Sequence, residues 1–245
     1  MIFASDLDNT LIHSYKTAKS GDICVEVKDG KELSFMSPQT HLLLKDIAER
    51  YIFLPVTTRS LEQYLRIDLG VKPKYAVIAH GALLLIDGKT DEAWSVETRK
   101  LLKSPLPKLD STVVSDTLLY DIRYVENFFI FAKSEEPIKA VEYLKTILKK
   151  IIDQELFEIY AVHNKVYIFP VGLNKGVAVN RLKNRLQIQR VMCAGDSKLD
   201  IPMLETADIA IVPQSLGLSG KHYRILPDEK FTSEILAFTA TDNYP

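Results

Sequence analysis

The sequence has little cysteine, almost no net charge and no long apolar run, and each shortage argues against a class of protein. Its 245 residues include two cysteines, Cys24 and Cys193, far apart in the chain. We therefore expect no disulfide framework, and two free thiols are typical of a reducing cytoplasm. The formal net charge of -1 gives no overall field for nucleic acid or an anionic membrane. Apolar runs such as 82–86 are far too short to cross a bilayer, and the early acidic residues Asp6 and Asp8 are not expected in a signal peptide.

What is present is the pattern of an α/β protein. Short apolar runs that end in polar loops alternate with segments of helical periodicity, which predicts a Rossmann-like parallel sheet with right-handed crossovers. Asp29-Gly30 between two β-rich stretches predicts a hairpin over 23–36. Ser37-Pro38 and Ser60 are expected to begin helices. The predicted strands outside the middle of the chain cover 2–5, 51–56, 75–79, 190–194 and 208–212, and later helices start near 174, 201 and 232.

The middle of the chain has a different pattern. Two strand pairs, 117–124 with 127–133 and 156–162 with 166–169, flank a helix that opens near Pro137. Such a segment can bury a small core of its own. We therefore predict an α+β domain at 85–166, inserted between the two parts of the α/β core at 1–84 and 167–245.

Polar residues follow the predicted core strands at the points where the strands end. In an open α/β sheet, ligands bind beyond the carboxyl ends of the strands, so these residues are expected to share one crevice. The segments are Asp6-Leu7-Asp8-Asn9-Thr10, Thr57-Thr58-Arg59, the helix start at Lys175, and Gly195-Asp196-Ser197-Lys198-Leu199-Asp200.

Several carboxylates in one crevice repel each other, and without a cation one of them would take up a proton. A hard divalent ion resolves this repulsion, and Mg²⁺ suits a site with few carboxylates and a substrate phosphate. Asp196 and Asp200 stand four residues apart, so both face the same side if a helix begins at that turn.

These residue types fit phosphoryl transfer. Asp6 is placed to attack phosphorus, because carboxylates act as covalent nucleophiles toward phosphoryl groups. Asp8, two residues later, can protonate the leaving alcohol and then activate water. Thr57 and Lys175 supply a hydroxyl donor and a positive charge that would hold the phosphoryl group during transfer.

The complete set of motifs resembles the haloacid dehalogenase superfamily. The four segments that carry the resemblance are Asp6-Leu7-Asp8-Asn9-Thr10-Leu11, Val56-Thr57-Thr58-Arg59, Lys175-Gly176 and the run from Gly195 to Leu204. The insert lies between the second and third of these segments, which is similar to the branch with a type C2B cap. That branch includes Cof-type sugar phosphatases, sucrose-phosphate phosphatases, mannosyl-phosphoglycerate phosphatases and eukaryotic phosphomannomutases.

The resemblance implies a ligand set and a reaction. It implies Mg²⁺ held by Asp6, the backbone carbonyl of Asp8 and Asp196, with support from Asp200. An acid at Asp8 suits the hydrolysis of phosphate esters or phosphomutase chemistry rather than dehalogenation. The implied enzyme is a phosphatase that acts through an aspartyl-phosphate intermediate.

The expected partner is a small phosphorylated metabolite, with a sugar phosphate as the substrate class that the branch implies. Thr58 and Arg59 are predicted to bind this substrate. Two alternatives stay open: a sugar phosphomutase, and a non-catalytic module that binds a phosphorylated ligand. Leu199 stands where the branch often has asparagine, which is the one feature that favours the non-catalytic module. The 23–36 hairpin is expected either to be structural or to overhang the site as a flap.

Overall fold

The computed structural model describes residues 1–102, 104–109, 118–151 and 154–241. The chain divides into two compact units, Met1–Asp91 with Lys175–Pro245, and Glu92–Asn174. The inserted unit therefore begins later than the expected residue 85 and ends later than 166. Strand β7 (Leu83–Ile86) pairs with β6 (Tyr75–Ile78) inside the first unit, whereas β12 (Lys165–Pro170) pairs with strands of the insert.

The first unit is built on a five-stranded parallel sheet, as the alternating pattern predicts. Its strand order is β15-β14-β13-β1-β5. Both faces of such a sheet are covered by helices, so most of its strands are short runs of buried apolar residues. Edge strand β15 was not predicted, because its four residues are half-exposed and carry no clear apolar signal. The strands are β1 (Ile2–Ser5), β5 (Ile52–Pro55), β13 (Val191–Ala194), β14 (Ile209–Pro213) and β15 (Tyr223–Leu226).

The helices of this unit begin where the sequence places their capping residues. The Ser37 hydroxyl accepts a hydrogen bond from the backbone N–H of Thr40, and Ser60 forms a capping box with Gln63. Within the described residues, no helix has the length and apolar composition that a membrane span requires. The helices are α1 (Pro38–Arg50), α2 (Leu61–Leu65), α5 (Lys175–Arg185), α6 (Ile201–Leu204) and α7 (Phe231–Thr241).

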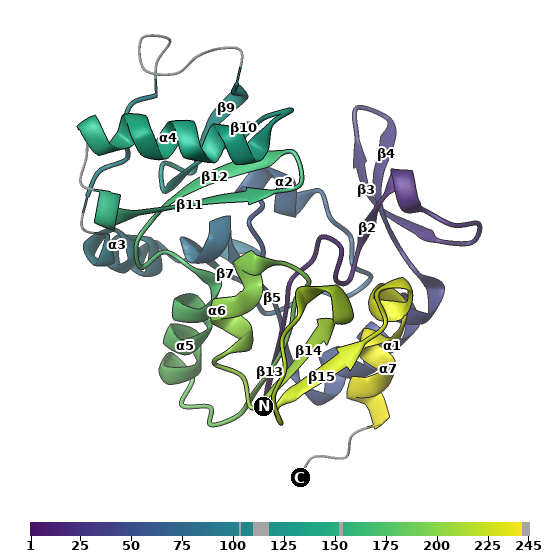
Figure 1. The fold of residues 1–245 in the computed structure, drawn as a ribbon. Coiled ribbons are helices and arrows are strands. Elements are labelled where there is room, and N and C mark those ends of the chain that lie inside the picture. Colours follow the sequence, from purple (N-terminus) through teal and green to yellow (C-terminus); the bar gives the residue numbers. More distant parts are fainter. Residues whose placement is uncertain (103, 110–117, 152–153, 242–245) are drawn as a thin grey trace. The chain divides into compact units, whose positions relative to one another are not determined.

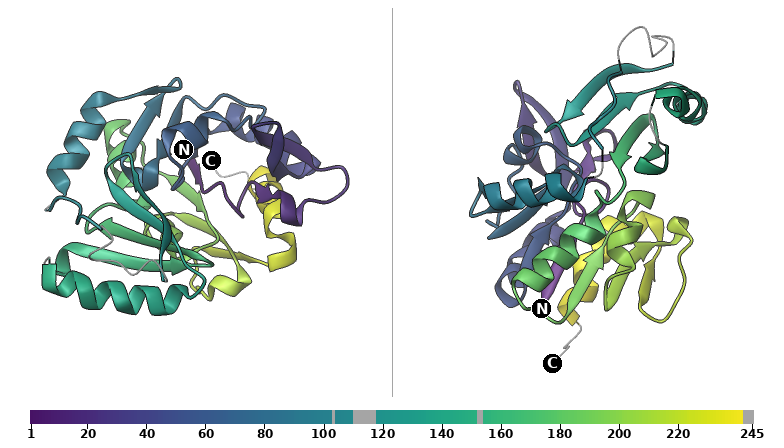
Figure 2. Two further views of the ribbon diagram at one scale, coloured as in Figure 1. Left: turned by 90° about the horizontal axis from the view of Figure 1, so that it is seen from above. Right: turned by 90° about the vertical axis from the view of Figure 1, so that its left-hand side faces the viewer.

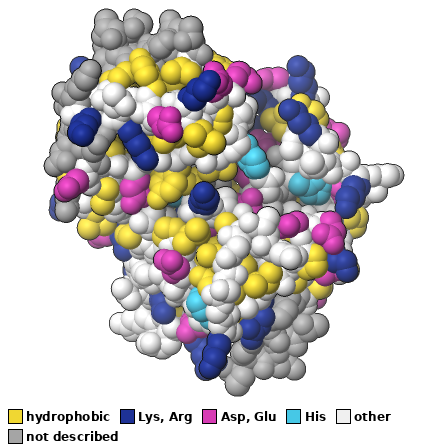
Figure 3. Space-filling view, in the orientation of Figure 1, with side chains coloured by type: hydrophobic (Ala, Val, Ile, Leu, Met, Phe, Trp, Pro, Cys, Tyr) yellow, Lys and Arg dark blue, Asp and Glu magenta, His cyan; other side chains and the backbone are white. Residues whose placement is uncertain are grey.

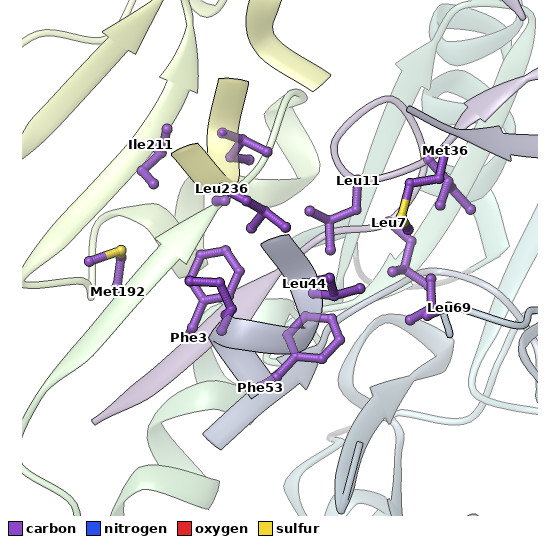
Figure 4. Close-up of a cluster of buried hydrophobic side chains, with 14 of the residues drawn as sticks. Phe3, Leu7, Leu11, Met36, Leu44, Phe53, Leu69, Met192, Ile211 and Leu236 are labelled. Atoms are coloured by element: carbon purple, nitrogen blue, oxygen red, sulfur yellow. The ribbon is translucent and has the colours of Figure 1, made fainter. Parts of the chain in front are cut away.

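A hydrophobic core lies between the sheet and the helix pair α1 and α7 (Figure 4). Phe3 of β1 and Phe53 of β5 stack with ring centroids 6.1 Å apart, and Leu44 of α1 and Leu236 of α7 pack in the same cluster. Each such side chain contributes roughly 1.5–3 kcal/mol when it is fully buried. This packing fixes the strands whose ends carry the candidate site.

Two small antiparallel sheets complete the first unit. The predicted hairpin is present as β3 (Ile23–Lys28) and β4 (Lys31–Met36), and β2 (His13–Ser14) pairs with β4. The second sheet joins β6, β7 and β8 (Lys89–Thr90). A single bridge between Val56 and Val77 connects the end of β5 to β6.

The inserted unit has an antiparallel four-stranded sheet in the order β11-β12-β10-β9, with α4 packed on one face of it (Figures 1 and 2). This is the α+β architecture that the sequence predicts. Thr117, at the start of one predicted strand, lies outside the described residues. Helix α3 was not predicted, because polar and charged residues interrupt its apolar positions. The further elements are α3 (Glu92–Leu101), β9 (Tyr120–Val125), β10 (Phe129–Lys133), α4 (Pro137–Ile151) and β11 (Phe157–Val162).

Short 3₁₀ helices occur in both units. They cover Tyr15–Thr17, Ala79–Gly81, Gln154–Leu156, Lys198–Asp200, Gln214–Leu216 and Asp228–Lys230. The helix at Lys198–Asp200 leads directly into α6, so Asp196 lies just before this helical segment and Asp200 lies within it.

Candidate active site

Polar residues that are distant in sequence meet at one edge of the parallel sheet. Strands β1, β5 and β13 end side by side, since Ser5 pairs with both Pro55 and Ala194. Parallel strands present their carboxyl ends at the same edge, where ligands bind in open α/β sheets. The residues that follow these ends include Asp6, Thr57 and Asp196.

Three of the predicted acids form one cluster. Each of Asp6, Asp196 and Asp200 offers a carboxylate oxygen, and these oxygens lie within 4.8 Å of one another. The carboxylate of Asp8 does not join them, because it is paired with Arg59. The predicted metal ligand of Asp8 is its backbone carbonyl, which this ion pair does not involve, so that part of the predicted set stays a prediction.

Lys175, the first residue of α5, is the cation of this cluster. Its side chain is 2% exposed, and its ammonium donates to Asp6 Oδ1 at 2.5 Å and to Asp200 Oδ1 at 2.6 Å. Burial alone would lower the pKa of Lys175, but the charges of Asp200 and Asp6 raise it above its ordinary value. The side chain is therefore a fixed positive charge beside the predicted nucleophile.

Two glycines make this approach sterically feasible. A Cβ on Gly195 would lie 2.5 Å from the Cβ of Asp200, so only glycine leaves room for that side chain. A Cβ on Gly176 would lie 2.1 Å from the backbone oxygen of Pro202, so glycine allows α5 to pack closely on α6. This packing brings Lys175 next to Asp200.

Asp200 is fully buried and both of its oxygens are engaged. Oδ1 accepts from Lys175, and Oδ2 accepts from the N–H of Ser197 at 2.9 Å and from its hydroxyl at 2.8 Å. The side chain of Asp196 is held more loosely, by a long hydrogen bond of 3.3 Å from the Thr10 hydroxyl. Asp200 is thus suited to hold its neighbours in place, and Asp196 to bind a ligand.

Burial and the charges of neighbouring carboxylates raise the pKa values of two of the clustered acids. Burial raises the pKa of Asp6 well above its ordinary 3.8, and although Lys175 opposes the shift, neighbouring carboxylates add to it. Burial and then the charge of Asp200 raise the pKa of Asp196 from 3.8 to about 7. Three ionised carboxylates against one ammonium leave two uncompensated negative charges. Oxygen ligands with excess negative charge are the donor set of a hard divalent cation, so the residues fit Mg²⁺.

Thr57 lies in a loop that the turn at Ala79–Gly81 holds in place. The backbone N–H of His80 donates to the Thr57 carbonyl at 2.9 Å, and the Thr57 N–H donates to Val77 at 2.9 Å. The Thr57 hydroxyl accepts from the N–H of Arg59 at 3.2 Å and can still donate its own proton. Thr57 is therefore held as a positioned donor at the end of β5.

Arg59, predicted to bind substrate, is paired with acidic side chains in this structure. Its guanidinium forms a bidentate ion pair with Asp8, with Nε to Oδ2 at 2.8 Å and Nη2 to Oδ1 at 2.7 Å. Its Nη1 donates to Glu26 Oε2 at 2.8 Å. Thr58 is half-buried between Thr57 and Arg59. The substrate-binding roles of Thr58 and Arg59 stay predictions.

Sequence reasoning missed Glu26, Ser34 and His80. Glu26 and Ser34 belong to the hairpin and contact Arg59. The available sequence signal was an acidic residue, Glu26, inside a β-rich run. His80 is buried with a φ of 60°, in the left-handed region, and burial and then Lys175 lower its pKa. A neutral His80 beside the lysine adds no further charge to the cluster.

The described surface carries charges of both signs. On the face drawn in Figure 3, lysine and arginine side chains alternate with acidic and apolar ones rather than gather in one basic area. This distribution agrees with the net charge of -1.

A family model of haloacid dehalogenase-like hydrolases matches residues 90–212. The matched segment contains Lys175, Asp196 and Asp200, and Asp6 lies before it. Among curated proteins, a phosphoglycolate phosphatase 2 of Saccharolobus solfataricus is 23% identical over 181 residues, which is 72% of this chain and 70% of that protein.

Solved structures have the same fold. The sucrose-phosphatase of Synechocystis sp. PCC6803 superposes with a TM-score of 0.65 at 18% identity, over 98% of this chain and 96% of that chain. A subclass IIB sugar phosphatase of the haloacid dehalogenase superfamily gives 0.59 at 14% identity, over 98% of each chain. At these identities the likeness concerns the fold: a parallel-sheet core with an inserted α+β domain.

Proposed function

The chain belongs to the haloacid dehalogenase-like hydrolases, and we propose that it hydrolyses the phosphomonoester of a small metabolite through an aspartyl-phosphate on Asp6. The observation that carries the proposal is the buried contact of Lys175 with Asp6 and Asp200, beside Asp196. Separate structural needs would rarely bring an ammonium and three acids from three sheet-edge segments into one cluster.

Asp6 is the proposed nucleophile. Its Oδ1 is held by Lys175, and the ammonium favours the ionised carboxylate that attack requires. In the first step an Asp6 oxygen forms a bond to phosphorus while the bond from phosphorus to the ester oxygen breaks. The electron pair of the broken bond leaves with the alcohol oxygen.

Asp8 is the proposed acid and base. Its side chain is 42% exposed, so an alcohol or a water molecule can reach it. It would donate a proton to the departing alcohol oxygen. It would then take a proton from the water that attacks phosphorus and releases phosphate, which restores Asp6.

Thr57 and Lys175 are proposed to contact the phosphoryl oxygens. The Lys175 ammonium contacts Asp6, and backbone hydrogen bonds hold Thr57 at the end of the neighbouring strand β5, so both donors can stabilise charge on the group in transfer without large rearrangement.

Mg²⁺ is the proposed cofactor. Asp6, Asp196 and the backbone carbonyl of Asp8 would hold it, and Asp200 would orient the cluster through Lys175 and Ser197. When bound, it would neutralise the carboxylates and withdraw charge from the phosphoryl oxygens. The strained acids, with the pKa values of Asp6 and Asp196 both raised, support this assignment.

The proposed substrate class is a sugar phosphate. The supporting observation is that two structural relatives are a sucrose-phosphatase and a sugar phosphatase by name, while the curated relative is named a phosphoglycolate phosphatase. All three names share a small phosphomonoester, which is the common chemistry proposed for this chain.

The test is a panel of phosphomonoesters, with release of inorganic phosphate measured in Mg²⁺ and in chelator. We expect Mg²⁺-dependent release, and its loss in Asp6→Asn. Asp46→Asn is the matched control, because Asp46 is an exposed residue of α1 outside the site. An Asp6→Asn variant that releases phosphate at the wild-type rate would overturn the proposed mechanism. Isomerisation of a hexose phosphate without net release would indicate a phosphomutase instead.

A further inference from the structure

We propose that Glu26, on the hairpin β3–β4, is a positioning residue that holds Arg59 so that Arg59 holds Asp8 in place for proton transfer. The inference rests on the proposed function, because it assigns the support of the acid and base of that reaction.

Glu26 is a buried carboxylate between two guanidinium groups. It is 3% exposed, with Oε2 accepting from Arg59 at 2.8 Å and Oε1 accepting from Arg66 at 3.1 Å. Ser34, its cross-strand partner, donates to Oε2 at 2.6 Å. Burial opposes ionisation, but Ser34 and Arg59 more than offset it and lower the pKa of Glu26. An ionised buried acid of this kind restricts the groups bound to it.

The backbone of the hairpin is shaped to aim this side chain inward. The register between β3 and β4 shifts on both sides of Glu26, so it lies between two irregularities of a bulge type. Val25 and Glu26 are consecutive and both buried, which a regular strand with alternating faces would not produce. Bulges redirect side chains and are common beside active sites. Glu26 also bridges to Ile67, which fixes the strand from its other side.

Arg59 connects this buried acid to Asp8. One guanidinium edge, Nε and Nη2, binds both oxygens of Asp8, and Nη1 binds Glu26. The Ser34 hydroxyl lies 3.2 Å from Nη2. While Asp8 carries the proton that it exchanges with the alcohol or with water, its ion pair with Arg59 is weaker, because the carboxyl group is then neutral. Glu26 and Ser34 then keep the guanidinium in position, so Asp8 returns to the same geometry.

The charges of the cluster explain why an acid is required at position 26. Arg59 and Arg66 bring two positive charges to one buried place, and Glu26 touches both. Without its charge, the two guanidinium groups would have no shared counter-ion, and the Arg59 guanidinium would keep its contacts with Asp8 and Ser34 but lose the one that anchors it to the hairpin acid.

The test compares two esters that differ in their need for an acid. Glucose 6-phosphate releases an alkoxide that must be protonated, whereas 4-nitrophenyl phosphate releases a stable phenolate. The quantity is kcat/KM, which covers the steps up to release of the alcohol. For Glu26→Gln we expect a fall of roughly ten-fold or more with glucose 6-phosphate and less than about two-fold with 4-nitrophenyl phosphate.

Glu62→Gln is the matched control, because Glu62 pairs with Arg66 but is 80% exposed in its side chain and does not contact Arg59. It should leave both values unchanged. Thermal unfolding reports whether Glu26→Gln remains folded, and Ser34→Ala, which should show the same selectivity in weaker form, replaces it if it does not. Equal falls for both esters, or no fall, would overturn the inference while leaving the proposed function intact. A wild-type protein that releases phosphate from no ester of the phosphomonoester panel, these two included, would overturn the proposed function and the inference together.

Discussion

Removal of the charge of Asp196 should stabilise the metal-free protein above neutral pH. Burial and Asp200 raise the pKa of Asp196 from 3.8 to about 7. Below the lower value, both the folded and the unfolded chain are protonated at this position. Between the two values the unfolded chain loses its proton and the folded chain keeps it, so the free energy of unfolding falls as pH rises. Above the higher value the loss is constant.

The size of the effect follows from the width of that window. Each pKa unit corresponds to about 1.4 kcal/mol, so the shift from 3.8 to about 7 gives a loss of roughly 4 kcal/mol at full ionisation. The amide introduced by Asp196→Asn does not ionise, and its oxygen can still accept from Thr10, which preserves the contact seen at 3.3 Å. In chelator, Asp196→Asn should exceed the wild type in stability by up to about 4 kcal/mol near pH 8 and match it near pH 4.

Magnesium should narrow this difference. A ligand that binds only the folded state at about a hundred times its Kd adds roughly 2.7 kcal/mol to the free energy of unfolding. The wild type should show this gain and Asp196→Asn should show little of it. The assay is urea unfolding followed by circular dichroism, at both pH values, in chelator and in Mg²⁺. Asp46→Asn serves again as the control that changes net charge without touching the site.

Two results would refute the reasoning. One is an Asp196→Asn variant that is no more stable than the wild type near pH 8 in chelator. The other is a difference in stability that does not change between the two pH values, since an effect of ionisation must vanish where neither state is ionised.

The remaining predictions concern the lysine, the glycine and a helix cap. Lys175→Met leaves the carboxylates of Asp6 and Asp200 without their shared cation, so we expect a loss of about 3–5 kcal/mol at neutral pH in urea unfolding, smaller in acid, and loss of phosphate release. Gly195→Ala places a Cβ 2.5 Å from that of Asp200, and should cost about 1–3 kcal/mol and lower kcat. Ser60→Ala removes the cap of α2 and should lower the free energy of unfolding by about 1 kcal/mol in urea unfolding. The kcat of the folded variant should match that of the wild type, and a fall in this kcat would contradict a purely structural role.

The location of the site was predictable because its residues follow buried strands. Asp6 and Asp196 come directly after apolar runs, and the carboxyl ends of parallel strands meet at one edge. Since these residues directly follow the strands, their position in the sequence predicts the edge of the sheet at which they lie. The starts of α1 and α2 were predictable for a different, local reason, because a serine oxygen caps the first turn of each helix.

The boundaries of the insert and the partners of Arg59 were not predictable in this way. Strand β7 lies in the first unit because of its hairpin pairing with β6, and local periodicity does not reveal which sheet a strand joins. The prediction that Arg59 binds substrate did not include its ion pairs with Asp8 and Glu26. Side chains 33 residues apart are brought together by an irregularity in strand register that no residue pattern marks.

The sequence by itself determined the parallel-sheet core, the inserted α+β domain, and the acids, hydroxyl and lysine at the strand ends, because these depend on periodicity and on residues next to the strands. Only the tertiary structure decided which acid pairs with which cation. Lys175 contacts Asp6 and Asp200, while Arg59 contacts Asp8. The physical reason is that an ion pair depends on distances of a few ångströms between distant segments, and those distances are set by how helices, turns and bulges pack.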